Sequence, residues 1–279
     1  MSDETVMLDG ASEPDQRCSS TAGGRVIAYT CRSPDKETEN EDTVAVAPFG
    51  PLATVLIVAD GAGGLPAGKR ASHVAVTTLI ETLQMAMAET ILLRTAILNG
   101  IDAANSAVQE LGNGSATTLT VVTVEGLTVR AYQIGDSEAI VVGQRGLIRL
   151  QTTVHSPTGF AVEAGFLDQR EALHHAERHL VSNFIGTADM RIDVGAEVRL
   201  QARDTIMLAS DGLMDNVHLD EIIQRIRVGP IDVALERVVS LANKRMAGAS
   251  AGQPSKPDDL SLILFRKPYD LKDRSAPQT

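Results

Sequence analysis

Short apolar runs broken by turn residues dominate the middle of the chain. The stretch 115–150, SATTLTVVTVEGLTVRAYQIGDSEAIVVGQRGLIRL, is interrupted at Glu125-Gly126 and at 144–146. Runs of this length separated by such turns are typical of antiparallel strands joined as hairpins. Further apolar runs of strand length occur at 25–30, 43–50, 53–59, in the first residues of 205–217, and at 260–267. The pattern therefore predicts extensive antiparallel sheet.

Helical spacing of apolar residues appears in two blocks. The segments 68–87 and 90–111 form the first block, and 219–226 and 231–245 form the second. Strands thus come in runs and helices come in runs, without repeated alternation of strand and helix. This arrangement favours an α+β fold in which helices cover antiparallel sheets. The segment 158–180 is more polar, and we expect it to be a surface insertion with a helix at 168–179.

The two ends of the chain differ from its middle. Residues 1–24 are rich in Ser, Gly, Asp and Glu, which predicts a flexible N-terminal arm. Residues 268–279 are polar and predict a flexible tail. No internal repeat or linker divides residues 25–267, so we expect them to form a single domain.

Composition narrows the classes of function. The 279 residues carry a formal net charge of −11, which argues against nucleic acid as a partner, because such binding depends on Lys and Arg. Acidity of this kind indicates either solubility or carboxylates gathered around metal ions. Cys18 and Cys31 do not suggest a disulfide framework, and we expect free thiols. Without a membrane-length apolar run or a signal peptide, the sequence predicts a cytoplasmic protein with no membrane partner.

A glycine-rich stretch after the strand at 53–59 offers a first hypothesis of function. Gly63 and Gly68-Lys69 have the spacing of a phosphate-binding loop, G-x-x-x-x-G-K. In that loop Ser or Thr follows the lysine and binds magnesium, whereas Arg70 stands here. Pro66 also removes a backbone N–H from the loop. Nucleotide binding is therefore a weaker reading than one centred on Asp60.

Acidic residues stand at the ends of five predicted strands. Asp60, Asp136 and Asp211 follow their strands, whereas Glu41-Asp42 and Asp258-Asp259 precede theirs. A single aspartate at a strand end is ordinarily a turn residue. Five such positions can converge at one rim of a sheet, where carboxylates repel one another unless a cation lies between them. Oxygen ligands without His or Cys at ligand spacing favour Mg²⁺ or Mn²⁺ over zinc.

These motifs together resemble a known family. They are NED (40–42), VADGAGG (58–64), AGKRAS (67–72), SATTL (115–119), IGDS (134–137), LASDGLMD (208–215) and PDDLS (257–261). In this order and approximate spacing they resemble the metal-dependent Ser/Thr protein phosphatases (PPM, type 2C), bacterial members in particular, from about Val26 to Arg266. The resemblance implies a four-layer α/β/β/α sandwich, two antiparallel sheets flanked by helices.

The resemblance also implies an activity. Family members hold two Mn²⁺ or Mg²⁺ ions with a bridging water, and such ions lower the pKa of the water and neutralise charge on the phosphoryl oxygens. The expected reaction is hydrolysis of phosphoserine or phosphothreonine in a phosphoprotein, opposing a Ser/Thr protein kinase. No phosphoenzyme is needed, and the sequence has no Cys-x5-Arg motif to form one.

Site residues follow from the same resemblance. Asp60 would bridge both metal ions, and the Gly61 carbonyl would bind one of them. Asp211 and Asp258 would bind the other ion. The remaining implied ligands are Glu41 and Asp42, which would bind or orient metal-bound waters, and Asp136, which would help to hold a weaker third ion. The implied catalytic residues are Asp42, Asp60 and Asp211.

Four positions depart from the family pattern. Glu37 stands where an Arg usually clamps the substrate phosphate, and Glu138 stands where an Arg usually follows the third motif. Val154 replaces an Asp, and Leu65 stands where bacterial relatives often have His. Losing a bidentate Arg–phosphate contact should weaken catalysis without abolishing it. We therefore expect an active enzyme that is slow or selective.

The missing arginine at position 37 leaves other residues as candidates for binding the substrate. Lys36 and Arg32 are candidates for binding the substrate phosphate in place of the missing arginine. The segment 158–180 corresponds to the variable flap of the family, where substrates can be selected. His155 is expected to be a structural residue rather than a catalytic acid.

Two other functions remain open from the sequence. A phosphatase-fold scaffold could bind phosphoproteins with weak or no turnover, which Glu37 and Glu138 favour and the complete set of acidic residues disfavours. A nucleotide-binding protein could use the segment 63–69, against which Arg70 counts.

Overall fold

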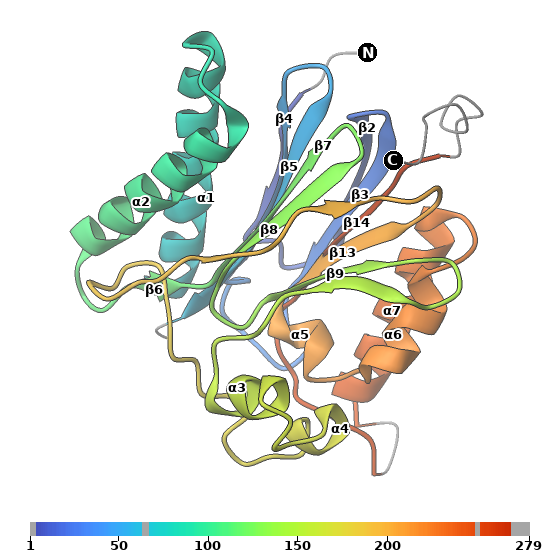
Figure 1. The fold of residues 1–279 in the computed structure, drawn as a ribbon. Coiled ribbons are helices and arrows are strands. Elements are labelled where there is room, and N and C mark those ends of the chain that lie inside the picture. Colours follow the sequence, from blue (N-terminus) through green and yellow to red (C-terminus); the bar gives the residue numbers. More distant parts are fainter. Residues whose placement is uncertain (1–3, 63–66, 249–251, 269–279) are drawn as a thin grey trace.

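Two antiparallel sheets pack face to face and carry helices on their outer faces (Figure 1). The computed structural model describes residues 4–62, 67–248 and 252–268. The first sheet has the order β1-β4-β5-β7-β8-β11, with β12 paired to β8 and β6 paired to β5. Its strands are β1 (Val6–Asp9), β4 (Asp42–Phe49), β5 (Ala53–Ala62), β6 (Ala116–Thr117), β7 (Leu119–Glu125), β8 (Thr128–Ile134), β11 (Asp193–Val194) and β12 (Val198–Arg199).

The second sheet has the order β10-β9-β13-β14-β3-β2. Its strands are β2 (Asp15–Thr21), β3 (Gly24–Cys31), β9 (Glu138–Val142), β10 (Ile148–Gln151), β13 (Thr205–Ala209) and β14 (Leu260–Arg266). Every pairing in both sheets is antiparallel. The predicted α+β sandwich of two antiparallel sheets flanked by helices is therefore confirmed.

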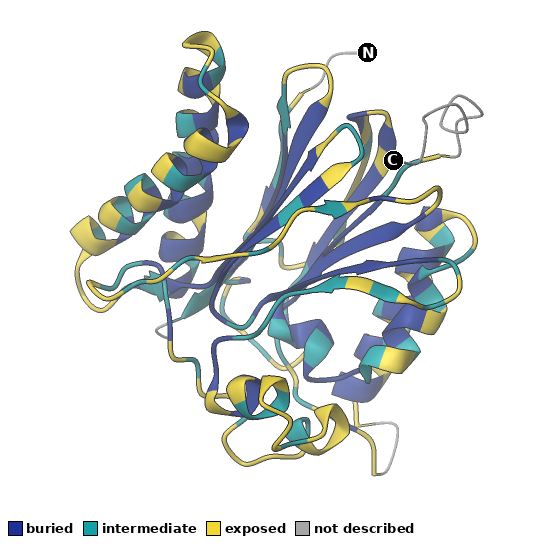
Figure 2. Ribbon diagram, viewed as in Figure 1, coloured by how far each residue is buried: buried dark blue, intermediate teal, exposed yellow. Residues whose placement is uncertain are grey.

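The hydrophobic core is divided into three layers by the two sheets. Helices α1 (Ala67–Ala88) and α2 (Leu93–Leu111) cover the outer face of the first sheet, and α6 (Leu219–Ile226) and α7 (Ile231–Met246) cover that of the second. A third layer, which includes Leu56 and Phe265, lies between the sheets. Central strands are buried on both faces (Figure 2), which explains their continuous apolar runs.

The predicted helices agree closely with the structure except in the flap. The segments predicted at 68–87, 90–111, 219–226 and 231–245 correspond to α1, α2, α6 and α7. In α1, Ala71, Ala75 and Leu79 are fully buried, as the helical period requires. The helix expected at 168–179 is wrong beyond its first turn, because α4 spans Gln169–Ala172 alone. The flap instead begins with α3 (Pro157–Glu163), which Ser156 caps.

The flexible arm expected at 1–24 is wrong for most of its length. Strand β1 pairs with β4, and β2 pairs with β3 along its full length. Strand β2, with the sequence DQRCSST, is an edge strand whose side chains are mostly exposed, so it lacks the apolar alternation that identifies a strand. Backbone hydrogen bonding holds it, not side-chain burial. The tail expected at 268–279 lies outside the described residues except for Pro268.

Two further expectations concern single features. Cys18 and Cys31 are both free thiols, as predicted. No helix in the described ranges combines the length and apolar character that a membrane crossing requires.

Candidate metal centre

The predicted carboxylates come from both sheets to one end of the sandwich. Asp42 begins β4 and Asp60 lies near the end of β5, in the first sheet. Asp211 begins the short helix α5 (Asp211–Met214) directly after β13, and Asp258 precedes β14, in the second sheet. Asp136 lies in the turn that leads from β8 to β9, and so from one sheet to the other. This end of the sandwich lies beside α5 in Figure 1.

Asp42 and Asp60 form the first-sheet half of the centre. They lie opposite each other in the register of β4 and β5. Asp42 is fully buried, and neither of its carboxylate oxygens makes a hydrogen bond of standard geometry with the described residues. Burial, followed by the charge of Asp259, raises the pKa of this carboxyl group well above its ordinary value, although the nearby hydroxyls of Ser261 and Ser210 lower it in part. A buried carboxylate without strong hydrogen bonds is costly, so this position calls for a proton or a cation.

The pKa of Asp60 shows that the carboxylates act on one another. Burial raises it well above the ordinary value, and the charges of Asp42, Asp211, Asp258 and Asp136 raise it further, in that order. Residues from β4, α5, the turn after β8 and the approach to β14 therefore share one electrostatic environment. The convergence expected from the strand-end pattern is present.

The turn that carries Asp136 is fixed by two contacts. Gly135 has a φ of +99°, and a Cβ there would lie 2.6 Å from the Thr118 side chain. The Gly135 amide donates to His155 Nδ1 over 3.2 Å, and His155 Nε2 lies 3.0 Å from Asp193 Oδ2. His155 is thus a buried structural residue, as expected. Burial, followed by the charges of Asp211 and Asp215, raises the pKa of Asp136 to about 8.

The second-sheet half of the centre contains a lysine. Lys256 Nζ lies 2.5 Å from Asp211 Oδ2, 2.9 Å from Asp215 Oδ2 and 3.1 Å from Asp258 Oδ2. Close packing holds this half together, because a Cβ on Gly212 would lie 1.9 Å from the Asp259 carbonyl oxygen. Neither Lys256 nor Asp215 was among the residues predicted from the sequence.

A second lysine reaches the centre from the loop before β4. Lys36 Nζ lies 2.5 Å from Glu41 Oε2 and 2.6 Å from Asp259 Oδ2. Arg32, in contrast, donates over 3.4 Å to the backbone carbonyls of Glu37 and Thr38, so it braces the loop. Lys36 is therefore next to predicted metal ligands, and its role in binding phosphate stays a prediction, as does that of Arg32.

The glycine-rich stretch has a packing role. A Cβ on Gly61 would lie 2.2 Å from the Gly68 carbonyl oxygen, and one on Gly68 would lie 2.5 Å from Glu41 Oε1. The start of α1 thus packs directly against the backbone of β5. Lys69 pairs with Glu39 at 2.8 Å. Gly63 and Pro66 of the proposed nucleotide loop, and Leu65, lie outside the described residues.

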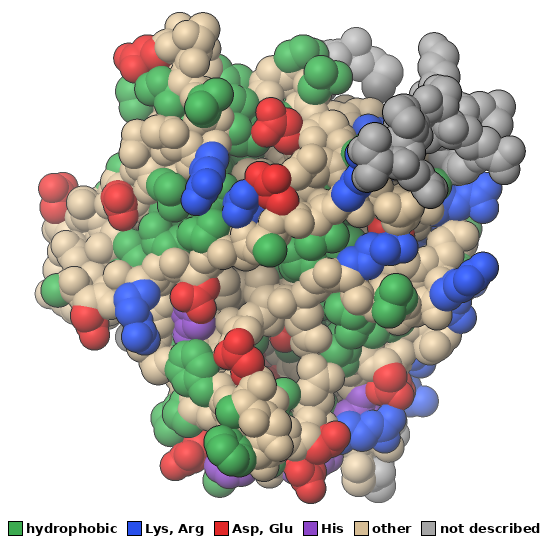
Figure 3. All heavy atoms as spheres, in the orientation of Figure 1, with side chains coloured by type: hydrophobic (Ala, Val, Ile, Leu, Met, Phe, Trp, Pro, Cys, Tyr) green, Lys and Arg blue, Asp and Glu red, His purple; other side chains and the backbone are tan. Residues whose placement is uncertain are grey.

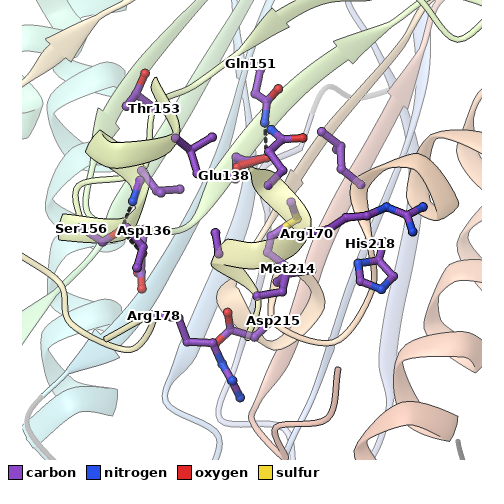
Figure 4. A pocket seen from close by; sticks show the side chains of 18 of the residues that line it. Asp136, Glu138, Gln151, Thr153, Ser156, Arg170, Arg178, Met214, Asp215 and His218 are labelled. Atoms are coloured by element: carbon purple, nitrogen blue, oxygen red, sulfur yellow. Dashed lines mark hydrogen bonds between the residues drawn. The ribbon is translucent and has the colours of Figure 1, made fainter. Parts of the chain in front are cut away.

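A cavity of about 620 Å³ adjoins the centre (Figure 4). Asp136, Asp211 and Asp215 line it on the side of the centre, and the flap covers it with residues of α3 and α4. Glu138 is buried in its wall and accepts a hydrogen bond of 3.3 Å from Gln151. Burial raises the pKa of Glu138 to about 7. Val154, the third departure from the family pattern, also lines this cavity.

Buried carboxylate oxygens without a hydrogen-bond partner in the described part of the chain occur in both halves of the centre. Unpartnered buried oxygens among the described residues include both of Asp42 and one each of Glu41 and Asp211. These are hard oxygen donors of the type that Mg²⁺ and Mn²⁺ prefer. As the side chains stand, no three His, Cys, Asp or Glu residues in the described ranges enclose a metal site. Lysine ammonium groups lie among them instead.

Signals for the two missed residues are present in the sequence. Asp215 follows Asp211 by four residues, so in a helical turn both carboxylates share a face. Lys256 stands two residues before Asp258, but no periodicity shows which way its side chain points.

On the face shown in Figure 3, acidic and basic side chains of the described residues are interspersed without a continuous basic patch.

Comparison with known proteins agrees with this geometry. The sequence model of the Protein phosphatase 2C family matches residues 34–244. The chain is 31% identical over 220 residues to the putative protein phosphatase 2C-type of Streptococcus pyogenes, which covers 75% of this chain and 88% of that protein. It is 29% identical over 251 residues to the serine/threonine phosphatase stp of Listeria monocytogenes, covering 85% and 94%.

Solved structures share the fold. The serine/threonine phosphatase of S. agalactiae superposes with a TM-score of 0.72 at 26% identity, covering 90% of this chain and 98% of that one. The catalytic domain of the serine/threonine protein phosphatase PstP, solved in complex with two manganese ions, superposes with a TM-score of 0.66 at 23% identity, covering 87% and 97%. Both the matched sequence and the arrangement of strand-end carboxylates lead to one conclusion: the chain belongs to the protein phosphatase 2C family.

Proposed function

We propose that this protein is a serine/threonine phosphoprotein phosphatase that depends on Mn²⁺ or Mg²⁺. The observation that carries the proposal is the convergence of Asp42, Asp60, Asp136, Asp211 and Asp258 at one end of the sandwich, where each raises the pKa of Asp60 or is itself shifted by the others. Carboxylates gathered in this way are stable at neutral pH when a cation offsets their charge.

Different sets of residues in the chain would hold the different metal ions. Asp60 and the Gly61 carbonyl would hold one ion, which Asp42 would bind directly or through water. Asp211 and Asp258, together with Asp60, would hold a second ion. Glu41 would bind or orient metal-bound water, and Asp136 would help to hold a weaker third ion. When bound, such ions lower the pKa of a water molecule and offset charge on the phosphoryl oxygens. The PstP structure, which contains two manganese ions, supports a metal-dependent centre of this general kind.

The cavity would receive the phosphorylated segment of the substrate. It extends from the centre to the flap, so a phosphate near Asp211 leaves neighbouring substrate residues beneath α3 and α4. Lys36 approaches the centre through Glu41 and Asp259, from the loop in which the resemblance to the family implies a phosphate-binding Arg. Glu37, at the expected position of that Arg, is exposed.

Hydrolysis of p-nitrophenyl phosphate and of a phosphothreonine peptide tests the proposal. Wild type should turn over both with Mn²⁺ and neither with EDTA. Asp60→Asn should abolish turnover, whereas Asp102→Asn, an exposed change on α2, should leave it intact. A folded wild type that binds Mn²⁺ and turns over neither substrate would contradict the proposal and favour the phosphoprotein-binding scaffold.

A further inference from the structure

Lys256 has an unusual position in the centre. Its ammonium is within 2.5–3.1 Å of three carboxylates, those of Asp211, Asp215 and Asp258. Its side chain is largely buried, with 25% of its surface exposed. In the other half of the centre, neither oxygen of Asp42 makes a hydrogen bond of standard geometry with the described residues. Lys36 lies against Glu41 and Asp259 on that side, so each half contains a lysine. Lys256, however, contacts three carboxylates, whereas no ion pair among the described residues engages Asp42.

The backbone at Lys256 is clamped to the helix that carries Asp211. Asn216, which is fully buried, accepts a hydrogen bond from the Lys256 amide over 2.7 Å. The Asn216 side chain also donates to the Lys256 carbonyl over 2.7 Å and to the Gly212 carbonyl over 2.8 Å. These bonds connect the loop before β14 to α5. The buried side chain of Asn216 thus fixes the backbone of Lys256 beside the three carboxylates. The position of the lysine is therefore set by the fold and not by an exposed, freely moving side chain.

The charges of Lys256 and its three carboxylate neighbours determine how this half of the centre can bind a metal ion. Three carboxylates packed together repel one another, and one ammonium at hydrogen-bonding distance offsets part of that repulsion. A divalent ion would offset more, but its oxygen ligands lie 2.0–2.6 Å from the metal for Mg²⁺ or Ca²⁺, so it cannot share this space with the ammonium. Lysine and metal ion therefore compete for the Oδ2 atoms of Asp211 and Asp258, whereas Asp211 Oδ1 has no partner among the described residues.

We propose that Lys256 is a resident cation that takes the place of one divalent ion in the Asp211–Asp215–Asp258 half of the centre. The inference rests on the metal centre of the proposed function and refines it. A first ion binds at Asp42 and Asp60, where no lysine or arginine among the described residues pairs with either carboxylate. An ion in the other half binds only by displacing the ammonium, so it requires a higher concentration of free metal.

Calorimetric titration with Mn²⁺ at pH 7 tests this directly. The proteins compared are wild type, Lys256→Met, Lys256→Arg and Lys244→Met, the last a change of an exposed lysine on α7. Lys256→Met should show a second binding event at least tenfold tighter than any second event in wild type. Lys256→Arg and Lys244→Met should behave as wild type. Equal numbers of sites and equal affinities in wild type and Lys256→Met would overturn the inference.

A second variant covers the case in which Lys256→Met does not fold. Asp258→Asn should leave the tight Mn²⁺ event unchanged in number and within threefold in affinity, because that event belongs to Asp42 and Asp60. Loss of a tight event in Asp258→Asn would overturn the inference. Phosphatase activity is measured separately: an active enzyme with indistinguishable titrations refutes the role of Lys256 alone, whereas absence of Mn²⁺ binding in every protein refutes the metal centre as well.

Discussion

Asp42 lies directly opposite Asp60 across β4 and β5, and its buried carboxylate makes no ion pair and no hydrogen bond of standard geometry with the described residues. Such a pair is unfavourable in the metal-free protein, because two buried like charges repel each other. Its presence is explained by what it can bind. The carboxylates that would bind metal therefore destabilise this end of the sandwich as long as no cation is bound.

Asp42→Asn should separate these two effects. The amide has nearly the same shape and no charge, so the metal-free protein should become more stable, with a melting temperature a few degrees higher. Mn²⁺ affinity should fall by at least about 10–100-fold, the range found when groups that support a metal are removed. Thermal unfolding with EDTA and with Mn²⁺ measures both quantities.

The surface change Asp102→Asn is the control for this experiment, since it removes a carboxylate from α2 without altering the centre. It should change neither the melting temperature in EDTA nor the increase caused by Mn²⁺. If Asp42→Asn destabilises the metal-free protein while retaining wild-type Mn²⁺ affinity, the carboxylate serves a structural bond and not a metal.

The metal-free protein should lose stability as the pH rises. Burial and the charges of Asp211 and Asp215 raise the pKa of Asp136 from 3.8 to about 8, and the pKa values of Asp42 and Asp60 shift in the same direction. Between these two pKa values the folded state binds protons that the unfolded chain has released. The free energy of unfolding therefore falls as pH increases, by about 1.4 kcal/mol per pH unit for each retained proton.

Urea denaturation in EDTA at several pH values between 5 and 8.5 measures this decline. Saturating Mn²⁺ should reduce it, because a bound cation replaces the protons as the partner of the carboxylates. A free energy of unfolding that increases with pH in EDTA would show that the carboxylates have favourable partners in the folded state.

The sequence predicted this centre because its carboxylates stand at strand ends. A strand that is buried on both faces, such as β5 or β13, is easily recognised, and the residue that follows it must lie at a rim of the sheet. This argument predicts that Asp60 and Asp211 lie at the rim of a sheet, and it needs no side-chain contacts. The separate runs of strands and helices predicted antiparallel sheet covered by helices, whereas the division into two sheets followed from the resemblance to the family.

The sequence pattern predicts neither the direction in which a side chain points nor the presence of a polar edge strand. Lys256 is part of the centre because Asn216, 40 residues earlier in the chain, holds its backbone, and such a long-range bond leaves no local pattern. Strand β2 is held by backbone bonds to β3 and has few buried side chains, so its composition resembles that of a flexible segment. The flap packs as short turns around the cavity and not as the longer helix that its composition suggested.

Glu138→Gln should stabilise the protein increasingly as the pH rises above about 4.5, with the full gain reached above pH 7. Burial raises the pKa of Glu138 from 4.5 to about 7, so its contribution to stability declines as pH rises between these values and remains low above pH 7. The amide carries no charge at any pH and can still accept the bond from Gln151. We expect a gain of about 1–3 kcal/mol at pH 8 and no gain at pH 4.5.

Urea denaturation at these two pH values tests this prediction, with Glu163→Gln as the matched control, an exposed residue that lines the same cavity. The control should show no pH-dependent gain. Equal stability of Glu138→Gln and wild type at pH 8 would mean that the Glu138 carboxylate is solvated through the cavity.

Gly61→Ala should disturb both the fold and the metal centre. A Cβ at this position would lie 2.2 Å from the Gly68 carbonyl oxygen, so the start of α1 must move away from β5. Overpacking of this kind costs about 1–3 kcal/mol. The movement also changes the backbone beside Asp60, so Mn²⁺ affinity should fall. Gly195→Ala is the matched control: its added Cβ would lie 3.3 Å from the Ala131 carbonyl oxygen, which a shift of a few tenths of an ångström relieves, so unfolding should change less than in Gly61→Ala and Mn²⁺ titration should not change. Wild-type stability and Mn²⁺ affinity in Gly61→Ala would show that α1 can shift without affecting the centre.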